Sequence, residues 1–299
     1  MTQHSRTPDG LVIVDKPSGF TSHDVVAKMR GIARTRRVGH AGTLDPMATG
    51  VLVLGVEKAT KLLGHLALTE KEYLGTIRLG QNTVTDDAEG EITSSADASA
   101  VTREGIDAGV AKLTGAIMQV PSKVSAIKID GKRSYARVRG GEEFEIPARP
   151  VTVSSFQVYD VREAVAEDGT PVVDLVVSVV CSSGTYIRAL ARDLGADLGV
   201  GGHLTALRRT RVGPYGLDTA KTLDQLQEEL AVMPIADAAA AAFPRWDVDE
   251  KQAKLLTNGV RLDMPAYDTS PVAVFGPDGR FLVLVEEQKG KAKSLAVFG

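Results

Sequence analysis

The pattern of hydrophobic and polar positions predicts a chain in which strands alternate with helices. Residues 11–14 and 51–56 are continuous apolar runs, which are typical of strands buried on both faces. Residues 72–79 alternate apolar with polar side chains, which suits a strand on the edge or face of a sheet. Further strands are predicted at 151–161, 172–181 and 203–212, and helices at 22–34, 58–66, 102–114 and 185–198. Elements of such uneven length favour an α+β fold with a mixed, mainly antiparallel central sheet flanked by helices and loops.

The C-terminal part of the sequence has a pattern of its own. An alanine-rich segment at 237–242 precedes Phe243 and Pro244, which is a plausible domain boundary. A short helix and two strands are predicted beyond it, in a β-rich unit of about 55 residues that is too small to be very stable alone. We therefore expect a main domain over residues 1–240 and a small β-rich domain over residues 241–299 that packs on it.

Two segments are predicted to lie outside the body of the main domain. Residues 81–100 are polar, acidic and rich in turn residues, so we expect an exposed loop there. Residues 121–150 form a basic excursion bracketed by proline and glycine, with a strand-like start. Such a segment indicates an arm that protrudes from the body and carries a function.

Composition limits the class of protein. With 43% hydrophobic and 24% charged residues in a chain of 299, it is that of an ordinary globular protein with an adequate core. No apolar run approaches the roughly 20 residues of a membrane helix, and the N-terminal residues lack the pattern of a secretory signal. A single cysteine, Cys181, excludes an internal disulfide framework and a cysteine-based zinc site. We expect a cytoplasmic protein that does not meet a membrane.

The charge of the chain is unevenly distributed. A net charge of -3 and an isoelectric point near 6.0 argue against a nucleic-acid partner. Basic residues nevertheless gather in the acid-poor stretches 28–40, 123–139 and 188–211, while acidic residues gather at 86–107 and 224–250. One basic run is usually a solvated face. Three of them in an acidic protein favour a side that faces a polyanion.

One polar loop within residues 36–55 contains a single carboxylate, Asp45. The following Pro46 favours an extended backbone at Asp45, and Gly42 and Gly50 allow the backbone to approach closely on either side. Asp-Pro between glycines is most often a turn. The loop alone therefore leaves open whether Asp45 is catalytic.

Several familiar catalytic patterns are absent from the sequence. The five histidines have no metal-ligand spacing with acids or with the cysteine, which argues against a metal hydrolase. There is no Walker-type phosphate loop and no Gly-x-Ser-x-Gly elbow. The sequence GVGG at 199–202 follows a predicted helix instead of a strand, so it does not indicate a dinucleotide site.

Four motifs in the expected order, spread over residues 11–215, carry a resemblance to a known family. The segment HAGTLDPMATG at 40–50 resembles the catalytic motif of pseudouridine synthases of the TruB type, the tRNA pseudouridine-55 synthases. The segment DKPSGFTS at 15–22 is similar to the first motif of that family. KEY at 71–73, followed by RLG at 78–80, is similar to its tyrosine motif, and CSSGTYIR at 181–188 to its arginine motif. The C-terminal tail resembles, more weakly, a small PUA-type RNA-binding domain.

This resemblance implies a pseudouridine synthase fold and the isomerisation of a uridine at position 55, in the T-loop of tRNA. The reaction breaks the N1–C1′ bond, turns the base and rejoins it through C5, so it needs neither a metal nor an organic cofactor. Asp45 would be the catalytic carboxylate, either attacking C1′ or stabilising positive charge there as glycosidase carboxylates do. Whether it attacks C1′ or a glycal path operates stays open. Arg188 would keep Asp45 ionised as a bidentate partner.

The resemblance also implies parts for residues that bind the substrate. The target base must leave the stacked loop, and His40 would contact or replace the flipped nucleotide. Tyr73 would stack on the uracil, with its hydroxyl placed for proton transfer near C5 or C2′. Tyr186 would support the catalytic carboxylate or its arginine. Lys16 would lie near the site, and Leu207 would pack beneath the base.

The arm at residues 121–150 would close over the T-stem loop of tRNA. Its contacts would be to phosphates, which position the RNA without reading its sequence. The residues expected to make them are Lys123, Lys132, Arg133, Arg137 and Arg139. The expected partner is therefore the T-stem loop of tRNA, with no obligatory protein partner, and we expect a monomer.

Two rival functions remain open at this point. An RNA chaperone could remodel tRNA without chemistry, and this role could coexist with the isomerase activity. A glycoside hydrolase acting on small sugars is disfavoured, because its usual second carboxylate is absent from the motifs.

Overall fold

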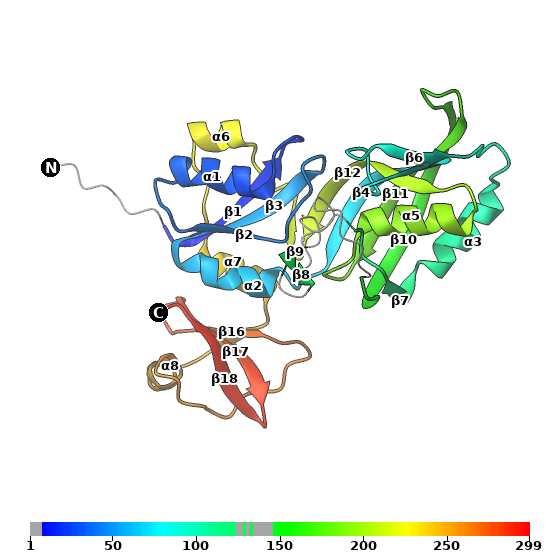
Figure 1. Ribbon diagram of the computed structural model, residues 1–299. Helices are drawn as coiled ribbons and strands as arrows, with labels where there is room; N and C mark the ends of the chain where they lie inside the picture. Colours follow the sequence, from blue (N-terminus) through cyan, green and yellow to red (C-terminus); the bar gives the residue numbers. More distant parts are fainter. Residues whose placement is uncertain (1–7, 124–127, 130–131, 134–145) are drawn as a thin grey trace. The chain divides into compact units, whose positions relative to one another are not determined.

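The computed structural model describes residues 8–123, 128–129, 132–133 and 146–299 (Figure 1). The chain folds into two compact units. The first consists of Met1–Pro46, Gly50–Thr69 and Val212–Gly299, and the second of Met47–Thr49 and Glu70–Arg211. Each unit combines helices with a mainly antiparallel sheet, so the predicted α+β class is confirmed.

The first unit is built on short antiparallel strands. β1 (Gly10–Lys16) lies between β14 (Met233–Pro234) and β3 (Thr49–Val56), and β2 (Val38–Ala41) pairs with β3. The pairing of β1 with β3 extends without a bulge from Gly10 opposite Val56 to Lys16 opposite Gly50. The Asp45 loop leads directly into β3. The pairing of β3 with β1 therefore fixes the C-terminal end of this loop.

Helices cover both faces of these strands. One face packs against α1 (Ser22–Ile32) and α6 (Leu223–Glu228), and the other against the 3-10 helix η1 (Glu57–Leu62), α2 (Leu63–Leu66) and α7 (Ile235–Ala242) (Figure 1). Successive side chains of a strand point to opposite faces of the sheet. Because both faces are covered, the side chains on both faces of β1 and β3 must be apolar. The two continuous apolar runs are thus explained, and the prediction of strands buried on both faces is confirmed.

Local sequence sets the ends of α1. The Thr21 hydroxyl accepts a hydrogen bond from the backbone N–H of Asp24, and the Asp24 carboxylate accepts one of 2.9 Å from the backbone N–H of Thr21. This capping box confirms the helix start predicted at Thr21 or Ser22. The helix ends at Ile32, before the predicted Arg34, whose backbone is left-handed with φ 51°.

The last part of the first unit forms a sheet of its own. Its strands lie in the order β15 (Arg245–Asp247), β16 (Val272–Phe275), β17 (Phe281–Gln288) and β18 (Lys291–Val297), and β15 is parallel to β16 while the other pairs are antiparallel. Helix α8 (Glu250–Thr257) packs on this sheet through Leu256. The predicted helix and two strands are present, whereas β15 and β18 were not predicted. The boundary expected at residue 240 falls inside α7, within the first unit, and Phe243 and Pro244 lie between α7 and β15.

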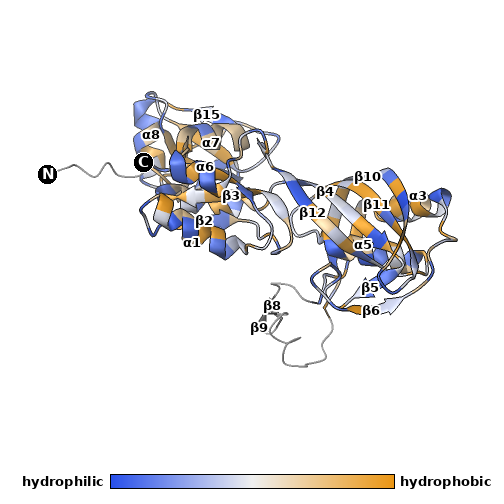
Figure 2. Ribbon diagram, turned by 90° about the horizontal axis from the view of Figure 1, so that it is seen from above, coloured by the Kyte–Doolittle hydropathy of each residue, from blue (hydrophilic) through white to orange (hydrophobic). Residues whose placement is uncertain are grey.

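The second unit contains a longer antiparallel sheet. In spatial order its strands are β12 (Gly202–Val212), β4 (Lys71–Leu79), β11 (Pro171–Cys181), β10 (Arg149–Val165) and β7 (Gly115–Gln119). Figure 2 shows hydrophobic residues interspersed with polar ones along β10 and β11. In the predicted arm, the two-residue strands β8 (Lys128–Ile129) and β9 (Lys132–Arg133) pair with each other.

Two helices of the second unit pack together. A Cβ at Gly109 in α3 (Arg103–Lys112) would lie 2.6 Å from Leu194 Cδ1 in α5 (Ile187–Asp197), so the helices approach closely. After α5 the chain turns sharply, because a Cβ at Gly195 would lie 2.2 Å from the backbone of Gly201. The GVGG sequence is therefore a tight turn between α5 and β12, in agreement with the rejection of a dinucleotide site.

The prediction of an exposed loop at residues 81–100 is wrong. It contains a hairpin of β5 (Gln81–Thr83) and β6 (Ile92–Ser95), and Gln81, Thr83 and Asp87 are buried. The helix predicted at 58–66 is present, as the 3-10 helix η1 followed by α2. Among the helices of the described part of the chain, none is long and apolar enough to cross a membrane.

Candidate active site

The Asp45 loop is held on its N-terminal side by the first residue of α1. The backbone N–H of Leu44 donates to Ser22 Oγ over 2.9 Å, and Ser22 Oγ donates to the carbonyl of Leu44 over 3.2 Å. Both residues are buried. The residue before Asp45 therefore has both of its backbone groups fixed to the start of a capped helix.

On the other side of Asp45, Lys16 holds the loop. This fully buried side chain donates to the carbonyl oxygens of Pro17 at 2.9 Å, Phe20 at 2.5 Å and Pro46 at 3.1 Å. The backbone N–H of Gly19 also donates to Pro46, over 2.8 Å. An ammonium has three donors, and these carbonyls take them. Lys16 thus lies beside the Asp45 loop, as the motif implied, and acts there by fixing Pro46.

The glycines expected around Asp45 adopt backbone conformations that favour glycine. Gly42 has φ 77° and Gly50 has φ 97°. A side chain at either position would be strained, because the left-handed region disfavours residues that carry a Cβ. Asp45 itself is half-buried. The backbone on both sides of Asp45 is therefore fixed, and Asp45 is partly shielded from water before any substrate arrives.

His40 lies on β2, in the same unit as Asp45, and is half-buried. Its ring meets that of His23, from α1, edge to face, with centroids 5.5 Å apart. His23 was not singled out from the sequence. Its position as the second residue of α1, directly after the first motif, is the signal that could have found it.

Tyr73 lies in the second unit, on the buried face of β4, with only 7% of its surface exposed. Gly75 follows on the same face, and a Cβ there would lie 3.6 Å from Leu207 Cδ1 on β12. The missing side chain lets β12 approach. The second unit therefore brings Tyr73 and Leu207 to one face of its sheet, as their predicted parts require.

Lys71 precedes Tyr73 on that face and is opposite Cys181 in the neighbouring strand. Burial, and to a smaller extent the charge of Arg209, lower the pKa of Lys71 to about 8. Burial raises the pKa of the Cys181 thiol to about 11, which makes it a poor nucleophile. Lys71 and Arg209 are buried cations that sequence reasoning missed.

Arg188 lies in the first turn of α5 and is almost fully buried. Its Nη1 atom donates to the carbonyl of Thr85 over 2.9 Å and forms an ion pair with Asp87 at 3.3 Å. Asp87 also accepts hydrogen bonds from the Thr85 hydroxyl at 2.5 Å and from the backbone N–H of Glu89 at 3.0 Å. Asp87 is therefore one carboxylate that the structure brings to Arg188, and the pairing of Arg188 with Asp45 stays a prediction.

Sequence reasoning missed Asp87 because it assigned the whole acidic stretch to an exposed loop. Asp86 and Asp87 adjoin an Ala-Glu-Gly sequence typical of an Asx turn, and Asp87 does accept from the N–H two residues on. Asp86 is left-handed, with φ 60°. A buried arginine such as Arg188 requires an acid, and the search for that acid was the available signal.

A second arginine of α5 extends this network. Arg192, one helical turn after Arg188, contacts Asp86 at 3.2 Å and donates to the carbonyl of Val120 over 2.7 Å. Next to Val120, the Gln119 side chain accepts from the backbone N–H of Tyr186 at 2.8 Å and donates to its carbonyl at 3.1 Å. The start of α5, with Tyr186 as its N-cap residue, is thus held by the residues that lead into the predicted arm.

The predicted site residues come from both units. Lys16, His40 and Asp45 belong to the first, and Tyr73, Tyr186, Arg188 and Leu207 belong to the second. Of the arm residues, Lys123 is exposed, Lys132 and Arg133 form β9, and Arg137 and Arg139 lie outside the described residues. Within the described ranges, no group of three or more His, Cys, Asp or Glu side chains could hold a metal ion.

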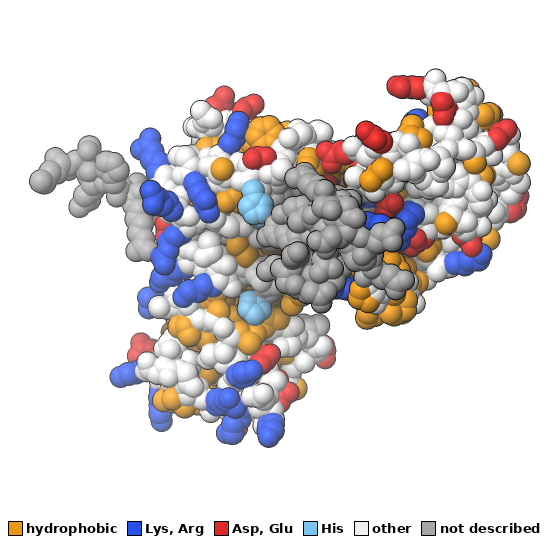
Figure 3. All heavy atoms as spheres, in the orientation of Figure 1, with side chains coloured by type: hydrophobic (Ala, Val, Ile, Leu, Met, Phe, Trp, Pro, Cys, Tyr) orange, Lys and Arg blue, Asp and Glu red, His pale blue; other side chains and the backbone are white. Residues whose placement is uncertain are grey.

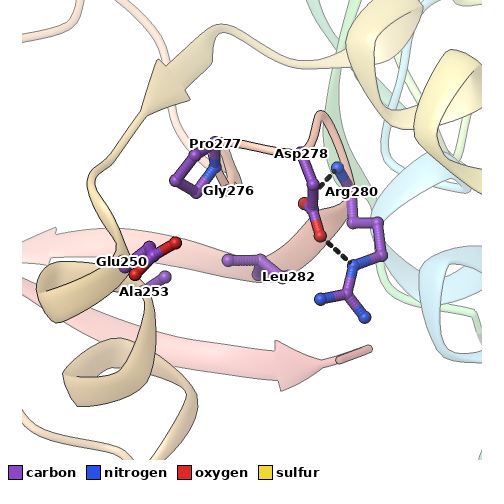
Figure 4. Close-up of a pocket in the computed structure, with 7 residues that line it drawn as sticks. All are labelled: Glu250, Ala253, Gly276, Pro277, Asp278, Arg280 and Leu282. Atoms are coloured by element: carbon purple, nitrogen blue, oxygen red, sulfur yellow. Dashed lines mark hydrogen bonds and ion pairs between the residues drawn. The ribbon is translucent and has the colours of Figure 1, made fainter.

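A hollow of about 500 Å³ lies on the C-terminal sheet, at the turn between β16 and β17 (Figure 4). Its charged residues include Asp278 and Arg280, which pair with each other, since Arg280 Nε donates to the Asp278 carboxylate over 2.5 Å. Glu250 lines it from α8. The hollow contains none of the predicted site residues and is separate from the candidate active site.

Comparison with family models gives matches along most of the chain. A model described as TruB family pseudouridylate synthase (N terminal domain) matches residues 30–187. Models described as tRNA pseudouridylate synthase B C-terminal domain and as tRNA Pseudouridine synthase II, C terminal, match residues 188–240 and 243–299.

Similar proteins and structures agree with these matches. The tRNA pseudouridine synthase B of Streptomyces griseus is 89% identical over 298 residues, 100% of both chains, and that of Thermobifida fusca is 58% identical over 290 residues, 97% of this chain and 98% of that one. Among solved structures, a chain of a Cbf5-Nop10-Gar1 complex has a TM-score of 0.74 at 25% identity, covering 98% of this chain and 85% of that one. A chain of an H/ACA RNP bound to a substrate RNA containing 2'-deoxyuridine has a TM-score of 0.71 at 24% identity, covering 97% and 85%, and shows the same fold.

Proposed function

Because the chain belongs to the TruB family of pseudouridine synthases, enzymes that isomerise uridine in tRNA to pseudouridine, we propose that its target is uridine 55 in the T-loop of tRNA. The sequence HAGTLDPMATG at residues 40–50, which matches the family's catalytic motif, supports this choice of target. The relatives that share the chain from end to end are named for the tRNA reaction. The target position itself follows from the resemblance of the motif.

Asp45 is the proposed catalytic carboxylate. The N1–C1′ bond breaks with its electrons going to the base, the carboxylate stabilises the positive charge at C1′ or bonds to it, and C5 of the turned base then bonds to C1′. The C5 proton leaves and N1 gains one, so no electrons are exchanged with another molecule. The clamping of Leu44 by Ser22 and of Pro46 by Lys16 supports this part, because an oriented carboxylate loses little entropy during the reaction.

Arg188 and Asp87 are proposed to supply the electrostatic setting of the reaction. A buried guanidinium favours the ionised form of a nearby carboxylate, and Asp87 keeps the guanidinium itself from being an uncompensated buried charge. The contacts with Asp87 and Thr85 thereby hold the Arg188 guanidinium in one orientation. Tyr186, the N-cap residue of the same helix, is proposed to support this arrangement.

The remaining site residues are proposed to bind the flipped nucleotide. Tyr73 stacks on the uracil and its hydroxyl serves proton transfer, and Leu207 packs beneath the base. Their shared face of the sheet supports these parts. His40 contacts or replaces the flipped base, and Lys16 acts indirectly by holding the Asp45 loop.

We further propose that residues 1–240 form the catalytic domain and residues 241–299 a PUA-like domain that binds RNA. The separate family match to 243–299 and the separate sheet from β15 to β18 support this division. The arm residues Lys123, Lys132, Arg133, Arg137 and Arg139 contact phosphates of the T-stem loop. The protein acts as a monomer in the cytoplasm, without a protein partner or a cofactor.

The observation that carries the proposal is the double clamp around Asp45 within the family motif. The test is to incubate the protein with unmodified tRNA transcript and to map pseudouridine by site. We expect modification at position 55. Modification only elsewhere in the tRNA would refute the target, and release of free uracil would refute the isomerase chemistry.

A further inference from the structure

A shallow basic hollow lies where α1 ends. It has a volume of about 770 Å³ and is lined by Arg30, Gly31, Arg34, Thr35 and Arg36. The three arginines are exposed. Lysine and arginine side chains gather along the edge of this unit where α1 ends (Figures 1 and 3). The hollow belongs wholly to the first unit and contains none of the predicted site residues.

These three arginines differ from most others in how their charge is balanced. Within the described part of the chain, no carboxylate lies at ion-pair distance from Arg30, Arg34 or Arg36. The carboxylate of Glu57 instead accepts a hydrogen bond from the Thr35 hydroxyl and pairs with Arg37 at 3.6 Å. Arginines elsewhere have acidic partners, among them Arg78, Arg103, Arg162, Arg188, Arg192, Arg211, Arg245 and Arg280.

The stability of helix α1 does not by itself require three arginines at its C-terminal end. A cation near the C-terminus of a helix interacts well with its dipole, and Arg30, in the last turn, provides one while donating to the carbonyl of Val38 at 3.5 Å. Arg34 and Arg36 lie beyond the helix, and Arg34 is held in the left-handed conformation that non-glycine residues seldom adopt. Like charges placed together repel each other, so the cluster is balanced best by an external anion.

The position of the hollow indicates what kind of anion this is. Helix α1 has 11 residues and a rise of about 1.5 Å per residue, so it is roughly 16 Å long. Its first residue, Ser22, holds the Asp45 loop, and its end forms the hollow. A ligand that occupies the Asp45 loop and also reaches the hollow must be a long polyanion.

We propose that Arg30, Arg34 and Arg36 bind phosphates of the substrate tRNA backbone at nucleotides outside the modified loop. This inference rests on the proposed function, because it takes tRNA as the molecule bound at Asp45. The arginines position the RNA through charge and read no base. Their contribution appears in affinity and in its dependence on salt, since each phosphate contact releases condensed counterions.

The test compares the double variant Arg34→Asn with Arg36→Gln against the wild type. Asparagine tolerates the left-handed backbone at position 34, and Arg30 is kept because it bonds to Val38. The matched control is Arg103→Gln with Arg162→Gln, which removes the same charge from two exposed arginines of the second unit. Circular dichroism and thermal unfolding establish that all three proteins are folded.

The readout is the dissociation constant for unmodified tRNA between 50 and 200 mM salt. The slope of log K against log salt should fall by roughly 0.7 to 0.9 for each lost contact, so the weakening of binding across this range should be about tenfold smaller in the double variant. The control should keep the wild-type slope, and the double variant should keep the wild-type turnover at saturating tRNA. A double variant with the wild-type slope would overturn the inference.

Two further outcomes separate this inference from the others. Failure of the wild type to modify position 55 would refute the proposed function, whereas the binding slopes test the hollow alone. Inorganic phosphate, added at millimolar concentration and constant ionic strength, tests for a small-anion site. If it removes the difference between wild type and double variant, the hollow binds small anions and the inference is wrong.

Discussion

The ion pair of Arg188 with Asp87 predicts a large effect from a nearly isosteric change. Asp87→Asn keeps the shape of the side chain but removes the charge that compensates Arg188. At 3.3 Å and an effective dielectric constant of about 20, the attraction between the two charges is about 5 kcal/mol before desolvation is counted. Breaking one partner of such a buried pair typically costs about 3–5 kcal/mol. We expect the free energy of unfolding to fall by about that amount.

Equilibrium urea denaturation measures this loss, and a second aspartate provides the control. Asp107→Asn removes the partner of Arg103 in an exposed i,i+4 pair of α3, where the expected cost is about 0.5 kcal/mol or less. Arg188→Met and the double variant with Asp87→Asn complete a cycle. The double variant should be more stable than the sum of the single losses predicts, because it removes both charges of this ion pair.

Asp87→Asn also tests whether the ion pair of Arg188 with Asp87 contributes to catalysis. Asp87→Asn should lower kcat for pseudouridine formation while the dissociation constant for tRNA stays near that of the wild type, because Asp87 orients Arg188 without facing the RNA backbone. A loss of stability no larger than that of Asp107→Asn, or strict additivity in the cycle, would refute the reasoning.

Three further predictions concern buried groups. In the folded protein the pKa of Lys71 is about 8, below its value of about 10.5 in the unfolded chain. From about pH 8 to 10.5 the unfolded chain therefore binds more protons, and the free energy of unfolding rises with pH. Urea denaturation of Lys71→Met should lack this rise. Gly195→Ala should lower the free energy of unfolding by at least about 1–3 kcal/mol, because its Cβ would meet the backbone of Gly201, and thermal unfolding measures the change. Lys16→Met removes one hydrogen-bond donor from each of three carbonyls, so we expect faster amide exchange in the Asp45 loop together with a lower kcat.

The sequence predicts well those features that depend on neighbouring residues. The apolar runs of β1 and β3 are buried on both faces, and Thr21 caps α1 through Asp24, three residues on. The motif around Asp45 identifies the candidate catalytic loop for the same reason, because its residues are contiguous. The strands β16 and β17 follow from short continuous apolar runs and from the turn between them.

What could not be predicted depends on partners far apart in the chain. Asp87 is about a hundred residues from Arg188, and nothing in its own neighbourhood distinguishes it from the exposed acids that follow. The motif places Lys16 near the site, but its burial and its bond to Pro46, thirty residues away, could not be predicted. The helix predicted at 58–66 is present, but its 3-10 start was not predicted: the backbone at Glu57 is left-handed, and the first part closes as a 3-10 helix.

The central claim is that Asp45 performs the chemistry of uridine isomerisation, and release of the C5 hydrogen tests it most directly. The protein would be mixed in excess with tRNA transcript tritiated at uridine C5, and tritium release would be followed in a single turnover beside tRNA binding. We predict that Asp45→Asn binds tRNA like the wild type and releases no tritium above background, while Asp107→Asn releases it at the wild-type rate. Release at the wild-type rate by Asp45→Asn would contradict the account.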